Sequence, residues 1–439
     1  MKKVNGIKRA LSLLTRNLWI FLLSMVLANI AGDMYLNMLP LYLKSLDANV
    51  IQVGVFFTIA AILPLILQIV GGWISDNLGR LRSIAIGSTL GVFSYIGLIL
   101  APTWQWVLAG HGLQSITRAL VGPSYGAFVA EETAEENRAR VYGVTNVIYT
   151  LVAVIGPPMG GWLADTYGFK VMLIVAGIIY LAATLIRIQM SRKAAVKGGK
   201  EAQPRKLTVN NLGKSLWISL GLMMGGGLLT WLLITDGARD ISYTMSFQLL
   251  PIYLKDFGGL GYQEIGWLSS ISGVTSMLVG IPAGWLADKK GERLSIVLGF
   301  ILELVALMLF IFMDGFVWYA IIWGIFGMAG AVMSPAYQSL LSKAIPERMR
   351  GTAFGLIDSS LGLFSLPAPA IGAYLWERFN PLFPVKITAG IVALSIIPVA
   401  LRFKITDRDR AGMAKAEAKF VEIAQPVEEK VPDYEQKDT

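Results

Sequence analysis

The feature that most constrains this chain is a repeat at a fixed offset. Two short polar loops, Gly72 to Arg82 and Gly284 to Arg293, each lie between two long apolar segments and recur 212 residues apart. Further pairs keep the same offset: Trp106 and Trp318, Pro123 and Pro335, Tyr125 and Tyr337, Gly143 and Gly355, Pro157 and Pro369, and Gly160 and Gly372. A constant offset over such a length predicts two copies of one folding unit.

The composition places both copies in a lipid bilayer. Of 439 residues, 55% are hydrophobic and only 15% are charged, and the mean hydropathy is +0.60, whereas soluble domains carry far more charge. The net charge of +9 does not indicate a nucleic-acid partner, because most Lys and Arg residues fall in the segments predicted to face the cytoplasm. The chain has no cysteine and one histidine, so we predict no metal site.

Twelve apolar segments are long enough to cross a bilayer, which needs about 20 residues each. We predict spans at 18–43, 51–74, 83–101, 105–129, 141–164, 170–189, 230–254, 263–287, 295–313, 316–341, 352–376 and 385–403. They define a cytoplasmic N-terminal arm (1–17), a first six-helix bundle (18–189), a cytoplasmic linker (190–229), a second six-helix bundle (230–403) and a cytoplasmic tail (404–439). Both termini are then cytoplasmic.

Residues 212–229 are apolar enough to approach a span. Counting them as one would give thirteen crossings and invert the second copy, which the duplication forbids. We therefore expect a surface helix or an extension of the following span, broken near Gly225, Gly226 and Gly227. In the tail, residues 411–423 can form an amphipathic helix.

Both loops contain Gly-x-x-x-Asp followed by glycine and basic residues, which resembles the loops between helices 2 and 3 and helices 8 and 9 of the major facilitator superfamily. The resemblance covers about residues 17–403, although Asn77 and Leu81 fill positions that are often basic. It implies an all-α multi-pass membrane protein with twelve transmembrane helices in two pseudo-symmetric six-helix bundles, whose central site opens alternately to each side.

The same resemblance implies that the two loops act as gates. The Asp76 carboxylate can accept hydrogen bonds from free amides at the start of the helix near Gly351, where the helix dipole favours negative charge. Alternatively, Arg80 and Arg82 only anchor lipid headgroups. The predicted gating residues are Gly72, Asp76, Gly79, Arg80, Arg82, Gly284, Asp288, Gly291 and Arg293.

A charge deep in a bilayer costs about 2.5–3.5 kcal/mol on insertion scales, so it needs a partner or a wet cavity. Asp33 lies near the middle of the first span, and Asn29, Tyr35 and Asn37 share its helix face. A buried carboxyl favours its protonated form, and a nearby cation favours the ionised form. We therefore predict that Asp33 loads and releases a proton. The alternative is a static ion pair with Arg118.

Arg118 precedes Gly122 and Pro123 in a segment similar to the family's helix 4 motif, which is linked to proton handling in exchangers. Its duplicate position is Gly330, so folding symmetry does not require a base there. Arginine remains charged and cannot carry the proton itself. Arg118 can bias a nearby carboxyl, clamp an anionic substrate, or form a structural pair.

Asp236, Arg239 and Asp240 form the densest charge cluster within a predicted span, and the two acids share one helix face. One interpretation is an internally neutralised inner gate; the other makes Asp240 a second proton or substrate site. We expect Glu303 to be structural and hold Asp358, opposite Asn146 in the duplication, as a reserve candidate.

Gly156, Pro157, Gly160 and Gly161 lie in a segment that resembles the core of a helix 5 motif associated with exporters that exchange substrate for protons. Proline removes a backbone donor and glycine allows close helix approach. The motif favours export over import. The alternative is a tight packing site that has no bearing on direction.

We predict proton coupling at Asp33, Arg118 and Asp240, without a cofactor, driven by a proton gradient. We predict a substrate cavity lined by Asn29, Tyr35, Asn37, Gln114, Tyr125, Asn146, Tyr149, Arg239, Phe247, Gln248, Tyr337, Gln338 and Asp358.

The leading hypothesis is a monomeric secondary transporter in the cell membrane that exports small amphiphilic or drug-like molecules in exchange for protons. Its partners are then the substrate, protons and lipid. The alternatives are an importer or facilitator of a sugar or organic anion, a lipid flippase, and a sensor that transports nothing. The sequence contains no nucleophile and base set or phosphate loop that would predict an enzyme.

Overall fold

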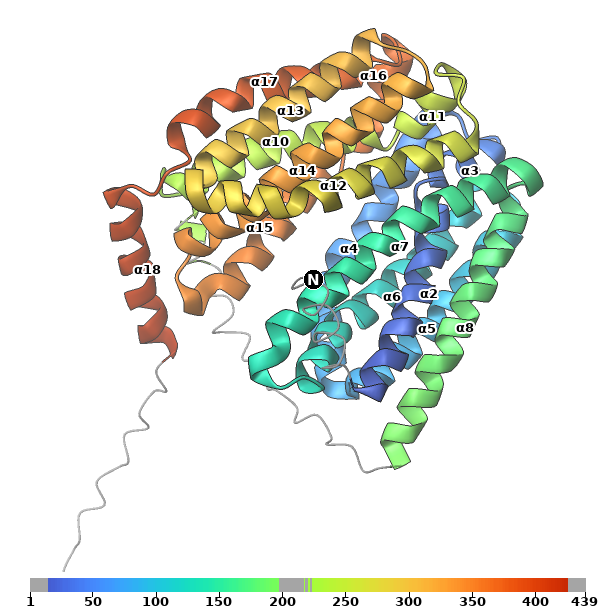
Figure 1. Ribbon diagram of the computed structural model, residues 1–439, viewed down its shortest axis with the longest axis horizontal. Coiled ribbons are helices and arrows are strands. Elements are labelled where there is room, and N and C mark those ends of the chain that lie inside the picture. Colours follow the sequence, from blue (N-terminus) through green and yellow to red (C-terminus); the bar gives the residue numbers. More distant parts are fainter. Residues whose placement is uncertain (1–14, 197–216, 218–219, 222, 425–439) are drawn as a thin grey trace, which may run out of the picture.

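The computed structural model describes residues 15–196, 217, 220–221 and 223–424, which are helical with short connections and contain no strand (Figure 1). The helices of the first bundle are α2 (Arg16–Leu36), α3 (Leu39–Ser45), α4 (Val50–Leu78), α5 (Arg80–Leu100), α6 (Trp104–Glu131), α7 (Arg138–Tyr167) and α8 (Phe169–Val196), with the short η1 (Glu135–Asn137). Those of the second bundle are α10 (Leu228–Phe247), α11 (Leu250–Asp256), α12 (Tyr262–Lys290), α13 (Glu292–Phe312), α14 (Phe316–Ala344), α15 (Arg350–Ser365), α16 (Ala368–Arg378) and α17 (Phe383–Arg402), with η2 (Glu347–Met349). The tail contributes α18 (Asp407–Ala424).

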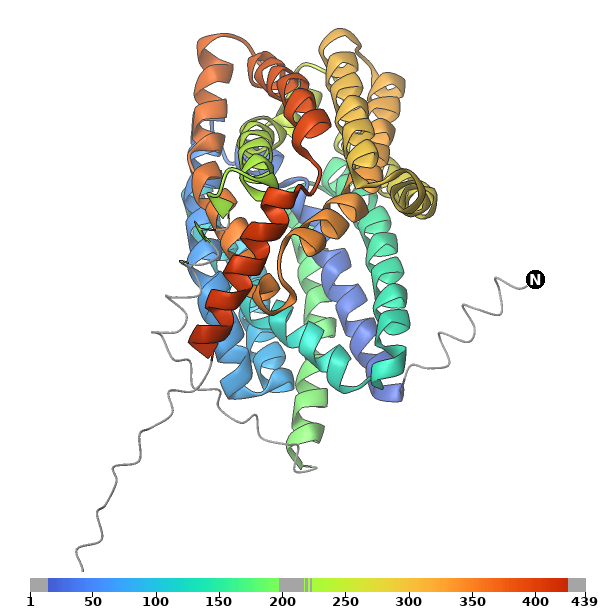
Figure 2. The same ribbon diagram turned by 90° about the vertical axis from the view of Figure 1, so that its left-hand side faces the viewer.

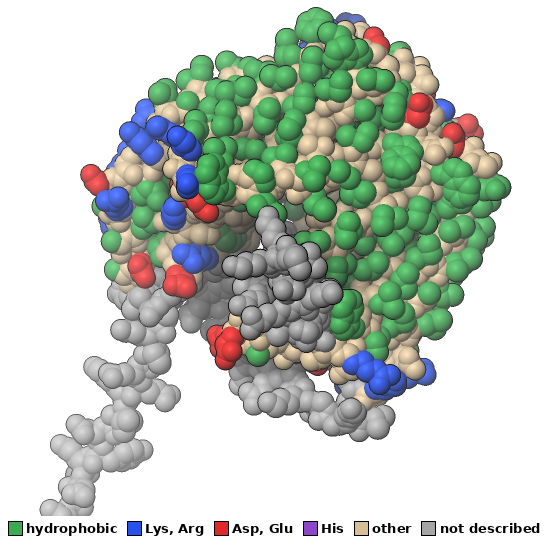
Figure 3. Space-filling model, in the orientation of Figure 1, with side chains coloured by type: hydrophobic (Ala, Val, Ile, Leu, Met, Phe, Trp, Pro, Cys, Tyr) green, Lys and Arg blue, Asp and Glu red, His purple; other side chains and the backbone are tan. Residues whose placement is uncertain are grey.

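The predicted all-α multi-pass fold is confirmed. Within the described residues, ten helical segments are long and apolar enough to cross a membrane. The further crossings are α6 and α10, which contain Arg118 and the cluster of Asp236, Arg239 and Asp240 and are therefore less apolar. Apolar side chains cover most of the flank shown in Figure 3, whereas Lys and Arg gather mainly at its left and lower edges. This is the surface expected of a protein surrounded by lipid.

Three crossings are broken near their ends by proline. The first, seventh and eleventh crossings each consist of two helices, and the second helix of each has proline in its first turn, at Pro40, Pro251 and Pro369. Proline fits that position because it lacks only an amide that the first turn does not use. By contrast, Pro157 and Pro158 leave α7 continuous.

The two repeated loops are tight turns made possible by glycine. Gly79 between α4 and α5 has φ +85°, and Gly291 between α12 and α13 has φ +89°, a region that other residues rarely adopt. The side chains of residues 68–78, 351 and 352 lie outside the described part of the chain. The contact expected of Asp76 therefore stays a prediction.

The two bundles meet at one end and diverge toward the other (Figures 1 and 2). At the first end α3 contacts α11, α4 contacts α16, and α7 contacts α12, and the Lys44 ammonium lies 2.5 Å from the Asp256 carboxylate. We call this the α3–α11 end. The opposite end carries α18, and we call it the α18 end.

Glycine makes the close approach at the α3–α11 end possible. A methyl group on Gly54 of α4 would lie 2.6 Å from the carbonyl oxygen of Pro369 in α16. The duplicate contact joins Gly266 of α12 to the carbonyl oxygen of Pro157 in α7, with even less room for a side chain. The seam between the bundles thus uses the same backbone contact twice.

The tail helix α18 is attached to the start of α10. Asp409 Oδ1 accepts a hydrogen bond of 2.7 Å from the Leu228 amide, the first of α10, and Arg408 donates 2.8 Å to the carbonyl of Gly225. Burial opposes the ionisation of Asp409, but the hydrogen bonds from Thr406 and Leu228 outweigh it and lower the pKa of Asp409. A carboxylate at this place satisfies a free amide and the helix dipole.

We predict that Asp409→Ala speeds hydrogen exchange at the Leu228 amide about fivefold, because a helix cap contributes about 1 kcal/mol. The contribution should be complete above the ordinary carboxyl pKa of about 3.9 and should disappear as the pH falls through the lowered value in the folded protein. Exchange measured by mass spectrometry checks both points. Asp407→Ala, which removes only an exposed ion pair with Arg410, is the control and should leave exchange at Leu228 unchanged.

Candidate functional site

A cavity of about 440 Å³ lies between the two bundles, a size typical of sites for small ligands. It is lined by α2 and α7 from the first bundle and by α12 and α14 from the second. The lining residues are Asp33, Asn37, Ala153, Pro157, Ser269, Ser272, Gly273, Ser276, Trp323, Phe326, Gly327 and Gly330.

Asp33 is the only charged residue among the described residues that line this cavity. Its side chain is half-buried, and the positive charge of Arg118 acts on it. No ion pair joins Asp33 to Arg118 among the described contacts, and the Arg118 side chain is exposed. The geometry therefore leaves the Asp33 carboxyl accessible from the cavity.

The helix 5 motif lies in α7, and its glycines pack against α2 at Asp33 and Met34 and against α12. A methyl group on Gly156 would lie 2.7 Å from the Asp33 Cβ, and one on Gly160 would overlap the carbonyl oxygen of Met34. On the other side of the motif, a methyl group on Gly161 would lie 2.9 Å from the Cα of Gln263 in α12. The motif thus joins the position of Asp33 to the contact between bundles.

Sequence reasoning missed much of the cavity wall. Ser269, Ser272 and Ser276 share one face of α12 and line the same cavity as Asp33, and Trp323 and Phe326 come from α14. The serine spacing is a signal visible in the sequence. Gly330, which occupies the position in the second copy that Arg118 occupies in the first, also lines the cavity. In the second bundle this position therefore faces the space between the bundles.

Two predicted cavity residues lie inside the first bundle. Tyr35 is 1% exposed, and its hydroxyl lies 3.1 Å from Nδ1 of the buried His111. Gln114 is also buried. The contact of Tyr35 with His111 joins α2 to α6.

The other predicted cavity residues are dispersed. The rings of Tyr125 and Tyr149 meet edge to face, 5.6 Å apart, and Phe247 meets the cavity residue Phe326 at 5.3 Å. Asn29, Gln248 and Tyr337 are half-buried, and Asn146 and Gln338 are exposed. Of the predicted set, Asn37 lines the cavity with Asp33, and the side chain of Asp358 lies outside the described residues.

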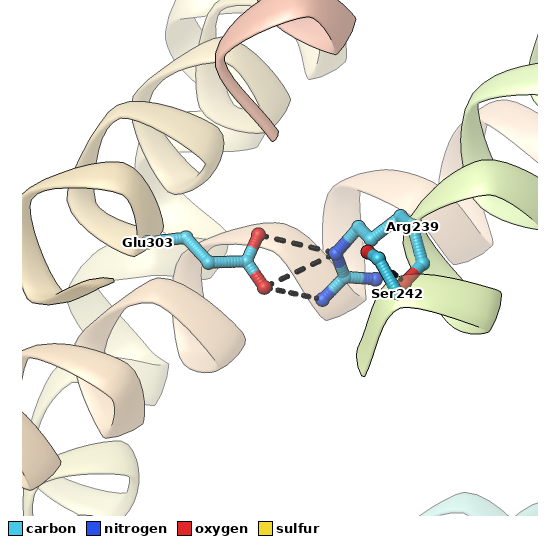
Figure 4. Close-up of polar contacts among 3 residues, drawn as sticks. All are labelled: Arg239, Ser242 and Glu303. Carbon is cyan, nitrogen blue, oxygen red and sulfur yellow. Dashed lines mark hydrogen bonds and ion pairs between the residues drawn. The ribbon is translucent and has the colours of Figure 1, made fainter. Parts of the chain in front are cut away.

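Arg239 is held by Glu303 (Figure 4). Its Nε lies 3.1 Å from both carboxylate oxygens and its Nη2 lies 3.0 Å from Oε1. Glu303 is 3% exposed, and the guanidinium also lies over the rings of Tyr243 and Phe300, at 5.0 and 5.7 Å. This bidentate pair between α10 and α13 neutralises both charges. In this structure the Arg239 guanidinium is therefore already bound to a carboxylate and cannot also bind an anionic substrate.

Asp240 is tied to the break in the eleventh crossing. The Ser365 hydroxyl, at the end of α15, donates a hydrogen bond of 2.5 Å to Asp240 Oδ2. Asp236 lies within electrostatic range of Arg239 and Glu303. Within the described residues, no three histidine or acidic side chains converge as metal ligands would.

A second buried arginine, Arg187 in α8, was not singled out from the sequence. It is 2% exposed, and it donates to Ser88 Oγ at 2.7 Å, to Ser24 Oγ at 3.3 Å and to Met25 Sδ at 2.8 Å. These partners are neutral groups on α2 and α5. Arg187 therefore joins three helices of the first bundle.

We predict that Glu303→Leu strongly lowers the thermal stability of the purified protein, because an unpaired buried charge costs about 3–5 kcal/mol. The double variant Arg239→Met with Glu303→Leu should recover most of that loss, since removing both charges leaves an apolar contact. Unfolding temperatures in detergent measure the effect. Equal loss in both variants would show that the pair is held for another reason.

We also predict that Gly160→Ala destabilises the fold by about 1–3 kcal/mol, the usual effect of overpacking, because the added methyl meets backbone atoms of α2. Gly143→Ala in the same helix is the matched control, since a methyl group there meets nothing within 4 Å. If the two variants unfold at the same temperature, the packing argument at Gly160 fails.

Comparison with known proteins agrees with this geometry. The family model of the Major Facilitator Superfamily matches residues 21–259 and 232–430. The chain is 24% identical over 402 residues to multidrug resistance protein MdtG of Dickeya zeae, with 87% of this chain and 92% of that protein aligned. It is 22% identical over 404 residues to the multi-drug resistance efflux pump PmrA homolog of Lactococcus lactis, with 91% and 97% aligned.

Solved structures show the same fold. A bacterial homologue of the iron transporter ferroportin in its inward-facing state matches with a TM-score of 0.71 at 17% identity, covering 88% of this chain and 98% of that one. A POT family transporter in complex with 5-aminolevulinic acid matches with a TM-score of 0.70 at 14% identity, covering 93% and 97%. The chain therefore belongs to the major facilitator superfamily and is a multi-pass membrane transporter.

Proposed function

We propose that this transporter exports small amphiphilic or drug-like molecules in exchange for protons, by opening its central cavity alternately to each side of the cell membrane. The observation that carries the proposal is that Asp33 is the single charged residue among those described that line the cavity between the bundles. A carboxyl in that position can hold a proton or face a substrate, and the two occupants exclude each other.

The composition of the cavity suits an amphiphilic solute. Trp323 and Phe326 offer aromatic faces to apolar groups or to a cation, and the hydroxyls of α12 offer hydrogen bonds. Protonation of Asp33 removes the one charge that the described part of the wall carries, so substrate affinity falls when the proton binds. Arg118 remains charged throughout. Asp240, bound to Ser365 at the break of the eleventh crossing, is the proposed second proton site.

The proposed orientation puts both termini and the basic α18 end in the cytoplasm, in keeping with the positive-inside rule. The structure would then be an inward-facing state, closed toward the outside at the α3–α11 end. Export is supported by the helix 5 motif packed on Asp33 and by the names of the efflux relatives. The proposed protein acts as a monomer and uses the proton gradient without a cofactor.

A second candidate is uptake of an organic anion. The exposed guanidinium of Arg118 within a membrane crossing favours it, because arginine is a good ligand for carboxylates and phosphates. This candidate predicts saturable uptake that depends on Arg118, with little effect of replacing Asp33.

We predict that Asp33→Asn abolishes transport driven by a pH gradient in reconstituted vesicles but leaves substrate binding and substrate exchange in part, because the amide binds solutes without carrying a proton. Transport of a panel of amphiphilic dyes, with and without the gradient, measures this. Asp314→Asn is the control, since Asp314 lies outside the cavity and accepts a hydrogen bond from Tyr319. Uphill transport that survives in Asp33→Asn would refute proton coupling at this residue.

A further inference from the structure

The ion pair at the α3–α11 end has an unusual relation to the duplication. Lys44 and Asp256 are 212 residues apart, which is the offset of the two copies, so they occupy equivalent positions. Two equivalent residues can touch only if both lie on the pseudo-two-fold axis that relates the bundles. Identical charges would repel there, and in this chain the two copies carry opposite charges.

The α18 end contains a second pair of equivalent positions with opposite charges. Glu131 ends α6 and Lys343 lies in the last turn of α14, and the same offset separates them. In this structure each is held inside its own bundle. Arg80 Nε lies 3.3 Å from Glu131 Oε1, and the Lys343 ammonium is bound to the Glu292 carboxylate.

Those two bridges are themselves duplicates in which the charges are exchanged. Arg80 and Glu292 are the first residues of α5 and α13 and occupy equivalent positions. Each bridge links the third crossing of its own bundle to the fourth. A neighbouring contact keeps its sign: Arg138 donates to the Ala130 carbonyl at 3.2 Å, and the equivalent Arg350 donates to the Ser342 carbonyl at 2.9 Å. The reversal is therefore specific to the bridge.

The members of the two bridges differ in exposure. The side chains of Glu131 and Lys343 are 60% and 58% exposed, whereas those of Arg80 and Glu292 are 25% and 20% exposed. The exposed pair ends α6 and α14, and α14 lines the cavity between the bundles through Trp323 and Gly330. Glu131 and Lys343 are thus the members free to reach the other bundle.

Each bundle in this fold consists of two inverted three-helix repeats. Lys44 and Asp256 end the first crossing of the first repeat in each bundle, and Glu131 and Lys343 end the first crossing of the second repeat. Inversion places the ends of equivalent crossings on opposite faces of the membrane. If the first pair lies on the axis at one face, the second lies near it at the other.

We propose that Glu131 and Lys343 form an ion pair with each other when the bundles close at the α18 end, in exchange for their bridges to Arg80 and Glu292. The pair is the counterpart of Lys44 and Asp256, and the two pairs exist in opposite states. The inference rests on the alternating access of the proposed function, and it is independent of proton coupling and of the substrate.

Disulfide crosslinking tests the geometry without background, because the chain contains no cysteine. Glu131→Cys with Lys343→Cys should crosslink only in molecules that have closed at the α18 end, and Lys44→Cys with Asp256→Cys should crosslink in the state described here. In the variant that carries all four substitutions, each molecule should acquire one crosslink and not both. Crosslinking of both pairs in one molecule would overturn the proposal. It would also be overturned if the cysteines at 131 and 343 stayed unlinked in molecules whose pair at 44 and 256 has opened.

Charge reversal tests the energetics. In an Arg80→Gln background, where Glu131 has no bridge to Arg80 to lose, Glu131→Lys should reduce the population closed at the α18 end about two- to fivefold, the range expected for one exposed ion pair. Adding Lys343→Glu should restore that population or raise it further, because it also removes the bridge to Glu292 that holds the open state. Spin labels at Lys193→Cys in α8 and Lys404→Cys after α17, which are both exposed, report the closure as a shorter distance. Failure of Lys343→Glu to restore the population would overturn the proposal.

Arg80→Gln is the matched control, because it removes the bridge within the first bundle and leaves both Glu131 and Lys343 in place. It should leave the closed population unchanged or raise it; a decrease like that of Glu131→Lys would assign the effect to the bridge and overturn the exchange. Alternating crosslinks in a protein that shows no proton-driven transport would refute the proposed function and support this inference. Proton-driven transport in a protein that never forms the crosslink between positions 131 and 343 would support the proposed function and refute this inference.

Discussion

The cost of placing charge in a bilayer governs this structure more than any other constraint. An ionised group within a membrane crossing must find a partner or water, and three of the charges in this chain meet that condition in different ways. Arg239 is paired with Glu303, Arg187 is surrounded by hydroxyl, carbonyl and sulfur acceptors, and Asp33 faces a cavity. The first two sites bind helices together, and only the third leaves its charge open to a ligand.

Asp33 is positioned by backbone rather than by side chains. Gly156 and Gly160 allow α7 to cross α2 at contact distance, and Pro157 lies in the same segment between the cavity and the other bundle. A displacement of one bundle against the other at α12 is therefore transmitted to the wall beside Asp33 without an intervening flexible side chain. The motif and the acid form one mechanical unit.

The sequence predicted the fold well because two strong signals agree: the length of the apolar segments and the fixed offset between the copies.

The candidate site was predicted only in part. Asp33 and Asn37 share a polar helix face that a single sequence displays, and both line the cavity. Tyr35 was wrongly grouped with them, because a residue two positions from Asp33 lies on the opposite side of the helix, where it points to His111. Arg239 and Glu303 lie 64 residues apart, and only the packing of α10 on α13 brings them together. The role of Arg187 could not be predicted from the sequence, because an arginine near the end of a span usually lies at the membrane interface. Its partners Ser24 and Ser88 belong to a residue type too frequent in such spans to indicate a pairing.

The seam at the α3–α11 end includes two equivalent contacts of glycine against carbonyl, at Gly54 with Pro369 and at Gly266 with Pro157. Parting these two contacts wets little hydrocarbon, and hydration of apolar surface costs about 25 cal/mol per Å². These two contacts therefore add little to the difference in solvation free energy between the two end states of the proposed transport cycle. The smaller that difference is, the more readily the binding of one small ligand or one proton decides, in the proposed cycle, which side of the membrane the cavity faces.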